Sequence, residues 1–320
     1  MCNDLDSQCG IGSSLTQGIG SISSINNNTD ISVCANCGKE GSSENMNTCN
    51  KCKQVKYCNA VCKKKHRSKH KKQCERRVAE LYDEKLFKEP PPLHEDCPIC
   101  FLRMPSFQSG WRYMTCCGKK ICSGCIHTGG VRKGLCPFCR TQSPKSVKEA
   151  AERNEKRVEA GDSHAIYSLG CCYGGGMYGF PRDMDKALEL WHRAAELGDA
   201  MAYTNIGASY KNGEGVETDK KKAIQYFELA ALGGDEEARY NLGNVEALAG
   251  NMDRAIKHYI IAVGCGSSGS LDIIKWSYSK GYATKEDYTK ALQSYQTYLG
   301  EIKSDQRDEA AAIDDEYRYY

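Results

Sequence analysis

The segments YSLGCCYGGG (167–176), TNIGASYKNG (204–213) and YNLGNVEALA (240–249) repeat an aliphatic residue followed by Gly at intervals of 37 and 36 residues. A Gly-Asp pair precedes each segment at the same intervals. Periods in this range are typical of helix pairs that stack into a solenoid. Small residues such as Gly170 and Gly207 let paired helices approach closely, and large ones such as Trp191 and Phe227 are expected to fill the layer between repeats. The sequence therefore predicts a mainly α-helical fold, with a helix-pair solenoid over residues 143–303.

Gly-rich segments such as 212–216 connect the predicted helices, and the period exceeds the roughly 34 residues of tetratricopeptide repeats. By these features the region resembles the Sel-one-like repeat. The resemblance covers two good copies (160–232), a shortened third (233–265) and a degenerate fourth (268–300). It implies that the repeats bind peptide or protein substrates along a concave face. The acidic tail, residues 304–320, is expected to cap the stack.

The repeats show no acid–base pair or nucleophile. Cys171 and Cys172 fall at positions where the next repeat has small residues, so we interpret them as packing residues rather than metal ligands. His164, His192 and His258 lack metal-ligand spacing and are expected to be surface or half-buried residues. The repeats are therefore predicted to bind proteins.

The cysteines are concentrated before the repeats. Fifteen of the 20 lie between residues 34 and 139, and with His70 they provide 16 candidate ligands, enough for four tetrahedral zinc ions. The sequence has no apolar run long enough to span a membrane, and its first residues lack the pattern of a secretory signal. Cysteines in such a chain point to reduced thiols and metal rather than disulfides. We therefore expect an intracellular protein, cytoplasmic or nuclear, and exclude a secreted disulfide scaffold and a membrane protein.

Residues 34–74 contain four ligand pairs, arranged as Cys-x2-Cys, Cys-x2-Cys, Cys-x3-Cys and His-x3-Cys. The x2 pairs suit knuckle turns, and the x3 pairs place both ligands on one face of a helix. This order resembles the MYND-type zinc finger, with all eight ligand positions filled. MYND fingers bind two ions in an interleaved way, which implies two ligand sets. They are Cys34, Cys37, Cys58 and Cys62 for one ion, and Cys49, Cys52, His70 and Cys74 for the other.

Three further features of this finger bear on its function. His66 is interpreted as a solvated surface residue, and Arg67 stands where the family usually has Trp, which calls the peptide-binding surface into question. The basic run 63–72 is either a phosphate-binding or nuclear-import patch or a solvated helix face. The second interpretation is preferred because no aromatic residues alternate with the charges. With a net charge of +3, the chain is not expected to bind nucleic acid.

A second cysteine module occupies residues 94–142. It opens with Cys97-Pro-Ile-Cys100 and closes with Cys136-Pro-Phe-Cys139-Arg140, on either side of an adjacent cysteine pair and a further knuckle. This pattern resembles an all-cysteine variant of the RING finger, whose cross-braced geometry implies two ligand sets. They are Cys97, Cys100, Cys122 and Cys125 for one ion, and Cys116, Cys117, Cys136 and Cys139 for the other. The second set is irregular, because Cys116 and Cys117 are adjacent and Lys119 occupies the usual His position. If only one of the adjacent pair binds zinc, Cys117 is the better ligand.

All four ions are expected to be structural, because each can have four protein ligands. The RING resemblance implies a ubiquitin ligase, which binds a charged ubiquitin-conjugating enzyme and acts by positioning, with no catalytic residue of its own. Ile99 would be the apolar anchor, Pro137 and Phe138 would complete a shallow groove, and Arg140 would hydrogen-bond the conjugating enzyme and ubiquitin. The leading hypothesis is a ligase whose repeats and MYND finger recruit substrates. The alternatives are a non-enzymatic scaffold with purely structural zinc and a nuclear regulator acting through the basic helix.

Two connecting segments complete the organisation. Residues 1–33 are rich in Ser, Asn and Gly and are predicted to be disordered. Residues 75–93 are predicted to be a linker with a short helix that ends at a run of prolines. Its Pro-Pro-Pro-Leu segment, 90–93, is similar to the Pro-rich peptides that MYND fingers bind. It either docks on such a finger or is a stiff spacer, and the spacer is preferred.

Overall fold

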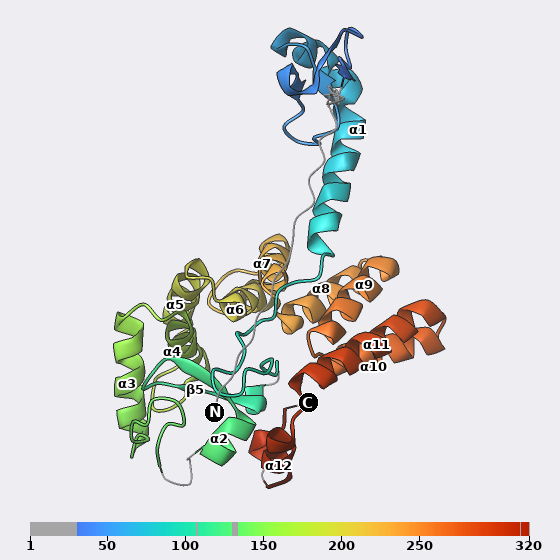
Figure 1. The fold of residues 1–320 in the computed structure, drawn as a ribbon. Helices are drawn as coiled ribbons and strands as arrows, with labels where there is room; N and C mark the ends of the chain where they lie inside the picture. Colours follow the sequence, from blue (N-terminus) through green and yellow to red (C-terminus); the bar gives the residue numbers. More distant parts are fainter. Residues whose placement is uncertain (1–30, 107, 130–133, 314, 320) are drawn as a thin grey trace, which may run out of the picture. The chain divides into compact units, whose positions relative to one another are not determined.

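The computed structural model describes residues 31–106, 108–129, 134–313 and 315–319, which divide into two compact units, 31–81 and 82–319. Most of the segment predicted to be disordered, residues 1–30, lies outside the described residues. The described residues form twelve α-helices and three two-stranded sheets, which confirms the mainly α-helical prediction (Figure 1). None of these helices is long and apolar enough to cross a membrane.

The first unit contains two small antiparallel hairpins before a long helix. Strand β1 (Ile31–Val33) pairs with β2 (Glu40–Ser42), and β3 (Asn47–Thr48) pairs with β4 (Lys56–Tyr57). A 3-10 turn, η1 (Ser43–Asn45), separates the hairpins. The prediction of disorder is therefore wrong for residues 31–33, because their backbone groups pair with β2.

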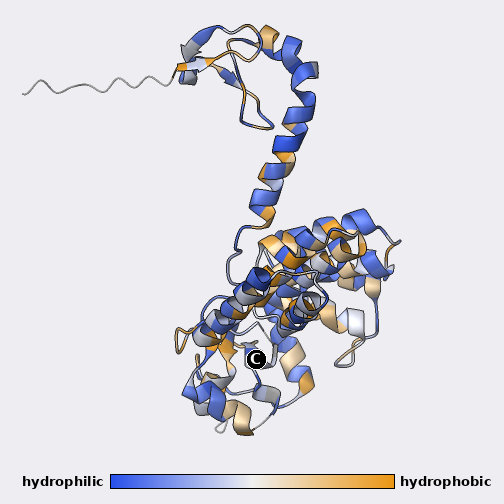
Figure 2. Cartoon of the chain, turned by 90° about the vertical axis from the view of Figure 1, so that its right-hand side faces the viewer, coloured by the Kyte–Doolittle hydropathy of each residue, from blue (hydrophilic) through white to orange (hydrophobic). Residues whose placement is uncertain are grey.

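Helix α1 (Ala60–Leu86) continues from the finger through most of the predicted linker. The helix expected in the linker over 75–93 is the second half of α1 rather than a short helix of its own, since no Gly or Pro interrupts residues 60–86. Ion pairs from Arg76 and Arg77 to Glu80, at 3.4 and 3.2 Å, add i,i+4 and i,i+3 support. Figure 2 shows that this helix is hydrophilic over most of its length.

The second cysteine module has one hairpin and one short helix. Strand β5 (Trp111–Met114) follows the 3-10 turn η2 (Gln108–Gly110) and pairs antiparallel with β6 (Lys119–Cys122), which leads into α2 (Ser123–Gly129). Its core consists of Met104, Ile121 and Ile126 together with the cysteines. A core this small is typical of domains that need metal or disulfides for stability.

The remaining helices form the solenoid and the segment that follows it. They are α3 (Val147–Glu159), α4 (Ser163–Gly175), α5 (Met184–Glu196), α6 (Ala200–Asn212), α7 (Lys220–Leu232), α8 (Glu236–Leu248), α9 (Met252–Gly264), α10 (Ser268–Ser279), α11 (Lys285–Ile302) and α12 (Asp305–Ile313), with the 3-10 turn η4 (Asp315–Tyr317). Helices α4/α5, α6/α7 and α8/α9 pack as pairs, and each pair packs on the next.

The repeated Gly-Asp pair acts at the junction between helix pairs. Gly198 and Gly234 both have a φ of 91°, a left-handed conformation that Gly adopts readily. The following Asp199 and Asp235 cap α6 and α8, each accepting a hydrogen bond from a backbone N–H of the first turn. One motif therefore ends one helix and begins the next.

The repeated aliphatic-Gly motif explains the tight contact within each pair. A Cβ added to Gly170, Gly207 or Gly243 would lie within 2.5–2.8 Å of an aromatic ring on the partner helix. These rings belong to Trp191, Phe227 and Tyr259. The expectation that Trp191 and Phe227 fill the layer between repeats is thus incomplete, because both rings lie against the glycine of their own pair.

The segment that follows α1 runs in extended form along the solenoid (Figure 1). Arg239 of α8 donates a hydrogen bond to the Leu86 carbonyl at 2.6 Å, and the Phe87 ring lies 4.7 Å from the ring of His258. The Pro91 carbonyl crosses so close to Gly234 that a Cβ there would lie 2.2 Å from it. Leu93 packs against the core of the first two helix pairs. The Pro-rich segment therefore packs on the repeats of its own chain.

Two histidines of the repeats are buried, contrary to the sequence interpretation. His164 is 8% exposed and His258 is 1% exposed, whereas His192 is half-buried as expected. His258 is covered by Phe87, and His164 packs against Trp111 and Tyr113 of β5. Both are covered by chain segments outside the repeats, so the helical periodicity alone could not indicate their burial.

Candidate metal centres and the RING-like surface

The sixteen candidate ligands lie in four groups, each with its ligand atoms within 4.8 Å of one another. The groups are Cys34, Cys37, Cys58 and Cys62; Cys49, Cys52, His70 and Cys74; Cys97, Cys100, Cys122 and Cys125; and Cys116, Cys117, Cys136 and Cys139. Tetrahedral zinc with Zn–S bonds of about 2.3 Å requires sulfur atoms about 3.8 Å apart. The geometry of all four groups therefore fits zinc.

In the finger over residues 34–74, the hairpin knuckles supply one half of each group and α1 supplies most of the other half. Cys37 and Cys58 have Sγ atoms 3.6 Å apart, and Cys49 and Cys74 have Sγ atoms 3.7 Å apart. The Nε2 atom of His70 lies 3.3 Å from the Cys52 Sγ, which makes Nε2 the ligand atom. His66 is half-buried rather than solvated, since its Nδ1 hydrogen-bonds the Tyr57 hydroxyl at 3.2 Å.

Cys116 and Cys117 both reach the same group of thiols in spite of being adjacent. They lie in the turn between β5 and β6, where Gly118 adopts a φ of 68° and its N–H bonds the Met114 carbonyl at 2.8 Å. Cys116 lies 3.4 Å from Cys139, Sγ to Sγ. The turn, with its left-handed Gly, lets two neighbouring side chains point to one ion.

The four thiols of the first RING-like group interact strongly. Hydrogen bonds from Cys100 and the other two thiols lower the pKa of Cys97, whereas contacts with the same group raise the pKa of Cys125. Four neighbouring thiolates repel one another, and a divalent cation such as Zn²⁺ would offset that repulsion.

Hydrogen bonds from the solenoid hold the turn that carries Cys116 and Cys117. Arg157 of α3 donates hydrogen bonds to the carbonyls of Thr115 and Cys116, at 3.3 and 3.0 Å. The Tyr113 hydroxyl donates to Asp162 at 2.7 Å. These contacts fix the irregular ligand turn from outside the module, and nothing in the Cys-x-x-Cys spacing indicated them.

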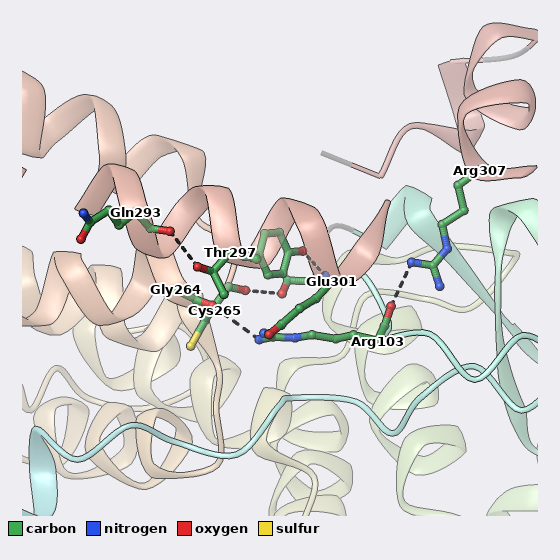
Figure 3. A network of polar contacts seen from close by, with 9 residues as sticks. Arg103, Gly264, Cys265, Gln293, Thr297, Glu301 and Arg307 are labelled. Atoms are coloured by element: carbon green, nitrogen blue, oxygen red, sulfur yellow. Dashed lines mark hydrogen bonds and ion pairs between the residues drawn. The ribbon is translucent and has the colours of Figure 1, made fainter. Parts of the chain in front are cut away.

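Residues 305–319 brace the other ligand group of the RING-like module. Arg307 is fully buried and donates a hydrogen bond to the carbonyl of Arg103 at 2.9 Å (Figure 3). It also donates to the carbonyl of Ile302. Its Nη2 lies 3.9 Å from the Cys100 Sγ. Burial opposes the charge on the guanidinium, but the thiolates of Cys122 and Cys100 outweigh it and raise the pKa of Arg307.

The same segment does more than cap the last repeat. Tyr319 packs on Tyr298 and Ile302 of α11, while α12 packs on α2 so closely that a Cβ on Gly124 would lie 2.9 Å from the Arg307 backbone nitrogen. The predicted acidic cap therefore joins the RING-like module to the end of the solenoid.

The residues predicted to contact a conjugating enzyme lie at the tips of two zinc knuckles. Ile99 is 36% exposed and Phe138 is 44% exposed, whereas Pro137 is buried. Arg140 is exposed, and its guanidinium donates to the carbonyl of Gly129, at the end of α2, at 3.2 Å. Ile99 and Phe138 are thus exposed apolar side chains on the two knuckles, and Arg140 is an exposed cation anchored to the end of α2.

Family models match two parts of the chain. Residues 34–74 match the MYND finger, and residues 163–199 and 200–235 match the Sel1 repeat. Both predicted resemblances are confirmed for these residues. The matching models do not cover residues 94–142, so the RING resemblance stays a prediction.

Several curated proteins are similar over part of the chain. A component of an ERAD-associated E3 ubiquitin-protein ligase, HRD3B of Arabidopsis thaliana, is 33% identical over 105 residues, which are 32% of this chain and 16% of the relative. Chitin synthase regulatory factor 4 of Schizosaccharomyces pombe is 28% identical, over 37% of this chain and 19% of the relative. The E3 ubiquitin-protein ligase DA2 of Arabidopsis thaliana is 36% identical over 20% of this chain and 17% of the relative. The chain thus spans less than a fifth of the length of these relatives.

Among solved structures, a Sel1 repeat protein from Oxalobacter formigenes is 29% identical, with a TM-score of 0.44 over 49% of this chain and 66% of that one. MYND fingers and Sel1 repeats generally mediate protein–protein interactions, so the matched segments mark this chain as a zinc-finger protein suited to an adaptor role.

Proposed function

We propose that this protein is a RING-type ubiquitin-protein ligase that binds four zinc ions and whose repeats and MYND finger recruit protein substrates. The observation that carries the proposal is the exposed set of Ile99, Phe138 and Arg140 at the two knuckle tips. In a ligase, the exposed apolar side chains of the two knuckles and the anchored guanidinium would hold a conjugating enzyme and its thioester-linked ubiquitin in one orientation. Positioning of this kind accelerates transfer without a nucleophile on the ligase.

The anchoring of Arg140 supports this role over a purely structural one. Its guanidinium is held by the Gly129 carbonyl, which fixes the position of the charge. The left-handed backbone at Arg140 recurs at Lys53 and Phe101, which also follow the second cysteine of a knuckle, so it belongs to the knuckle turn itself. The names of two similar proteins, which describe an E3 ligase component and an E3 ligase, agree with the proposal.

The test is discharge of ubiquitin from a panel of charged conjugating enzymes by the zinc-loaded chain. Ile99→Ala and Arg140→Ala should abolish stimulation while retaining the zinc content of the wild type. Lys145→Ala removes an exposed cation just beyond the last knuckle and should leave stimulation unchanged. If no enzyme of the panel is stimulated, or if Lys145→Ala is as inactive as Arg140→Ala, the proposal fails.

A non-enzymatic adaptor is the second candidate, and the matches to the MYND finger and the Sel1 repeat favour it. In an adaptor, all four metal groups would be purely structural. Partner binding would then survive Ile99→Ala and Arg140→Ala, and the wild-type chain would not stimulate discharge.

A further inference from the structure

A groove of about 890 Å³ lies in the MYND finger beside the second ligand group. One wall is the knuckle at Cys49–Lys51, the floor includes Tyr57 and His70, and the other wall is the first half of α1. The lining residues of α1 are 60, 63, 64, 67, 68, 70, 71, 74 and 75, which lie on one face of the helix. The groove is therefore a built feature of the finger.

Cations dominate its lining. Five lining residues are Lys or Arg, and Glu75 is the only carboxylate among the described lining residues. Lys63 donates to the Thr48 carbonyl and to Asn50 Oδ1, at 3.4 and 3.2 Å, and so joins the two walls. The other four cations, Lys51, Lys64, Arg67 and Lys71, are exposed and form no ion pair with any residue that the structure describes.

We infer that this groove binds an acidic peptide segment that carries a phosphorylated Ser or Thr. Phosphate is a strong acceptor, and an Arg with neighbouring Lys residues binds it by charge-assisted hydrogen bonds. Arg67 lies at the middle of the basic stripe, between Lys64 and Lys71, where it can bind a phosphate bidentately. Charge complementarity thus selects the occupant.

Two other occupants fit the groove less well. A single-stranded nucleic acid needs aromatic faces on which bases stack, but Tyr57, the aromatic residue of the lining, is only 1% exposed. A neutral Pro- and Leu-containing peptide supplies no counter-charge for the four exposed cations of the groove. The inference deepens the proposed recruitment role of the finger and does not depend on ligase activity.

The test uses fluorescence polarisation with the full zinc-loaded chain. The probe is a labelled pool of short peptides with a central phosphoserine between acidic residues and degenerate flanks. Three comparison probes are the unphosphorylated pool, a neutral Pro-Leu peptide and an oligo-dT of about 15 nucleotides. We expect the phosphorylated pool to bind and the Pro-Leu peptide to bind more weakly or not at all.

Arg67→Gln with Lys71→Gln should weaken binding of the phosphorylated pool about tenfold or more. The matched control is Lys65→Gln with Lys72→Gln, which removes the same charge from exposed positions of the same helix outside the groove. It should weaken binding by no more than about threefold. The zinc content of both variants is measured to confirm that the finger is intact.

Four results would overturn the inference. They are no binding of the phosphorylated pool, equal weakening by the two double variants, tighter binding of the Pro-Leu peptide, and tighter binding of oligo-dT that the groove variant abolishes. Ubiquitin discharge is measured separately, so a chain that discharges ubiquitin but does not bind the pool refutes this inference alone.

Discussion

Replacing Arg307 by Met should detach α12 from the RING-like module. The Met side chain keeps most of the apolar contact but removes the guanidinium, which leaves the buried carbonyls of Arg103 and Ile302 without this donor. Each unsatisfied carbonyl costs about 1–3 kcal/mol. The thiolates near Arg307 also lose a buried counter-charge. We therefore expect the docked state of α12 to lose about 3 kcal/mol or more, a factor of roughly 100 in its docking equilibrium.

Amide hydrogen exchange of the zinc-loaded chain measures this equilibrium. In the Arg307→Met variant, protection in α12 should fall roughly 100-fold, while protection in α4 to α7 stays within a small factor of the wild type. The matched control is Arg318→Met in the same segment, because the Arg318 side chain is 65% exposed and forms an ion pair with an exposed Asp315. The control should have little effect. Unchanged protection of α12 in Arg307→Met, or an equal loss in the control, would refute the reasoning.

Three further predictions follow from other contacts. The chain should bind four zinc ions, as counted by native mass spectrometry. In Cys117→Ser, a chelator should remove one ion at a concentration that leaves the other three bound; retention of all four ions would contradict the shared role of the adjacent thiols. Burial lowers the pKa of His258 to about 3, with Arg239 and Arg254 adding to the effect, so the neutral imidazole stabilises the fold above pH 6.5 and this contribution is lost as the pH falls toward 3. Between pH 7.5 and 5.5, the free energy of unfolding of the wild type should fall by about 1.4 kcal/mol more than that of His258→Phe, as measured by thermal melts at each pH. If the stability of the two proteins has the same pH dependence, the reasoning is wrong. Leu93→Asp should release the segment 87–93 from the repeats, because it places a charge against their apolar core. Trypsin should then cleave after the exposed Lys88 about tenfold faster or more, whereas an unchanged cleavage rate would show that Leu93 does not hold this segment on the repeats.

Features set by residues close together in sequence could be predicted. The Gly-Asp pair ends one helix and caps the next through its own backbone and side chain, so Gly198 and Asp199 reveal their role in the sequence itself. A cysteine knuckle is likewise complete within four residues, which is why the grouping of the MYND ligands could be expected from the family resemblance. Tyr57 and His66, nine residues apart, already required the folded finger to bring their side chains together.

Features that depend on distant segments could not be predicted. In the sequence, Arg307 is one basic residue in an acidic tail. It contacts Cys100, from which it is separated by 207 positions along the chain. The burial of His258 depends on Phe87, which belongs to the segment after α1. In both cases the group that covers or contacts the residue comes from elsewhere in the chain, so the local pattern does not indicate it.

The distance between Cys100 and Arg307 along the chain also sets an order of events during synthesis. Ribosomes add about 5–20 residues per second, so roughly 10–40 s separate the appearance of these two residues. The RING-like module is therefore synthesised before Arg307 exists to support its ligand group. Docking of α12 is a completion step that only a chain extended past residue 307 can make. A polypeptide interrupted before residue 305 would lack this support, which would make the module of an unfinished chain less stable than that of a finished one.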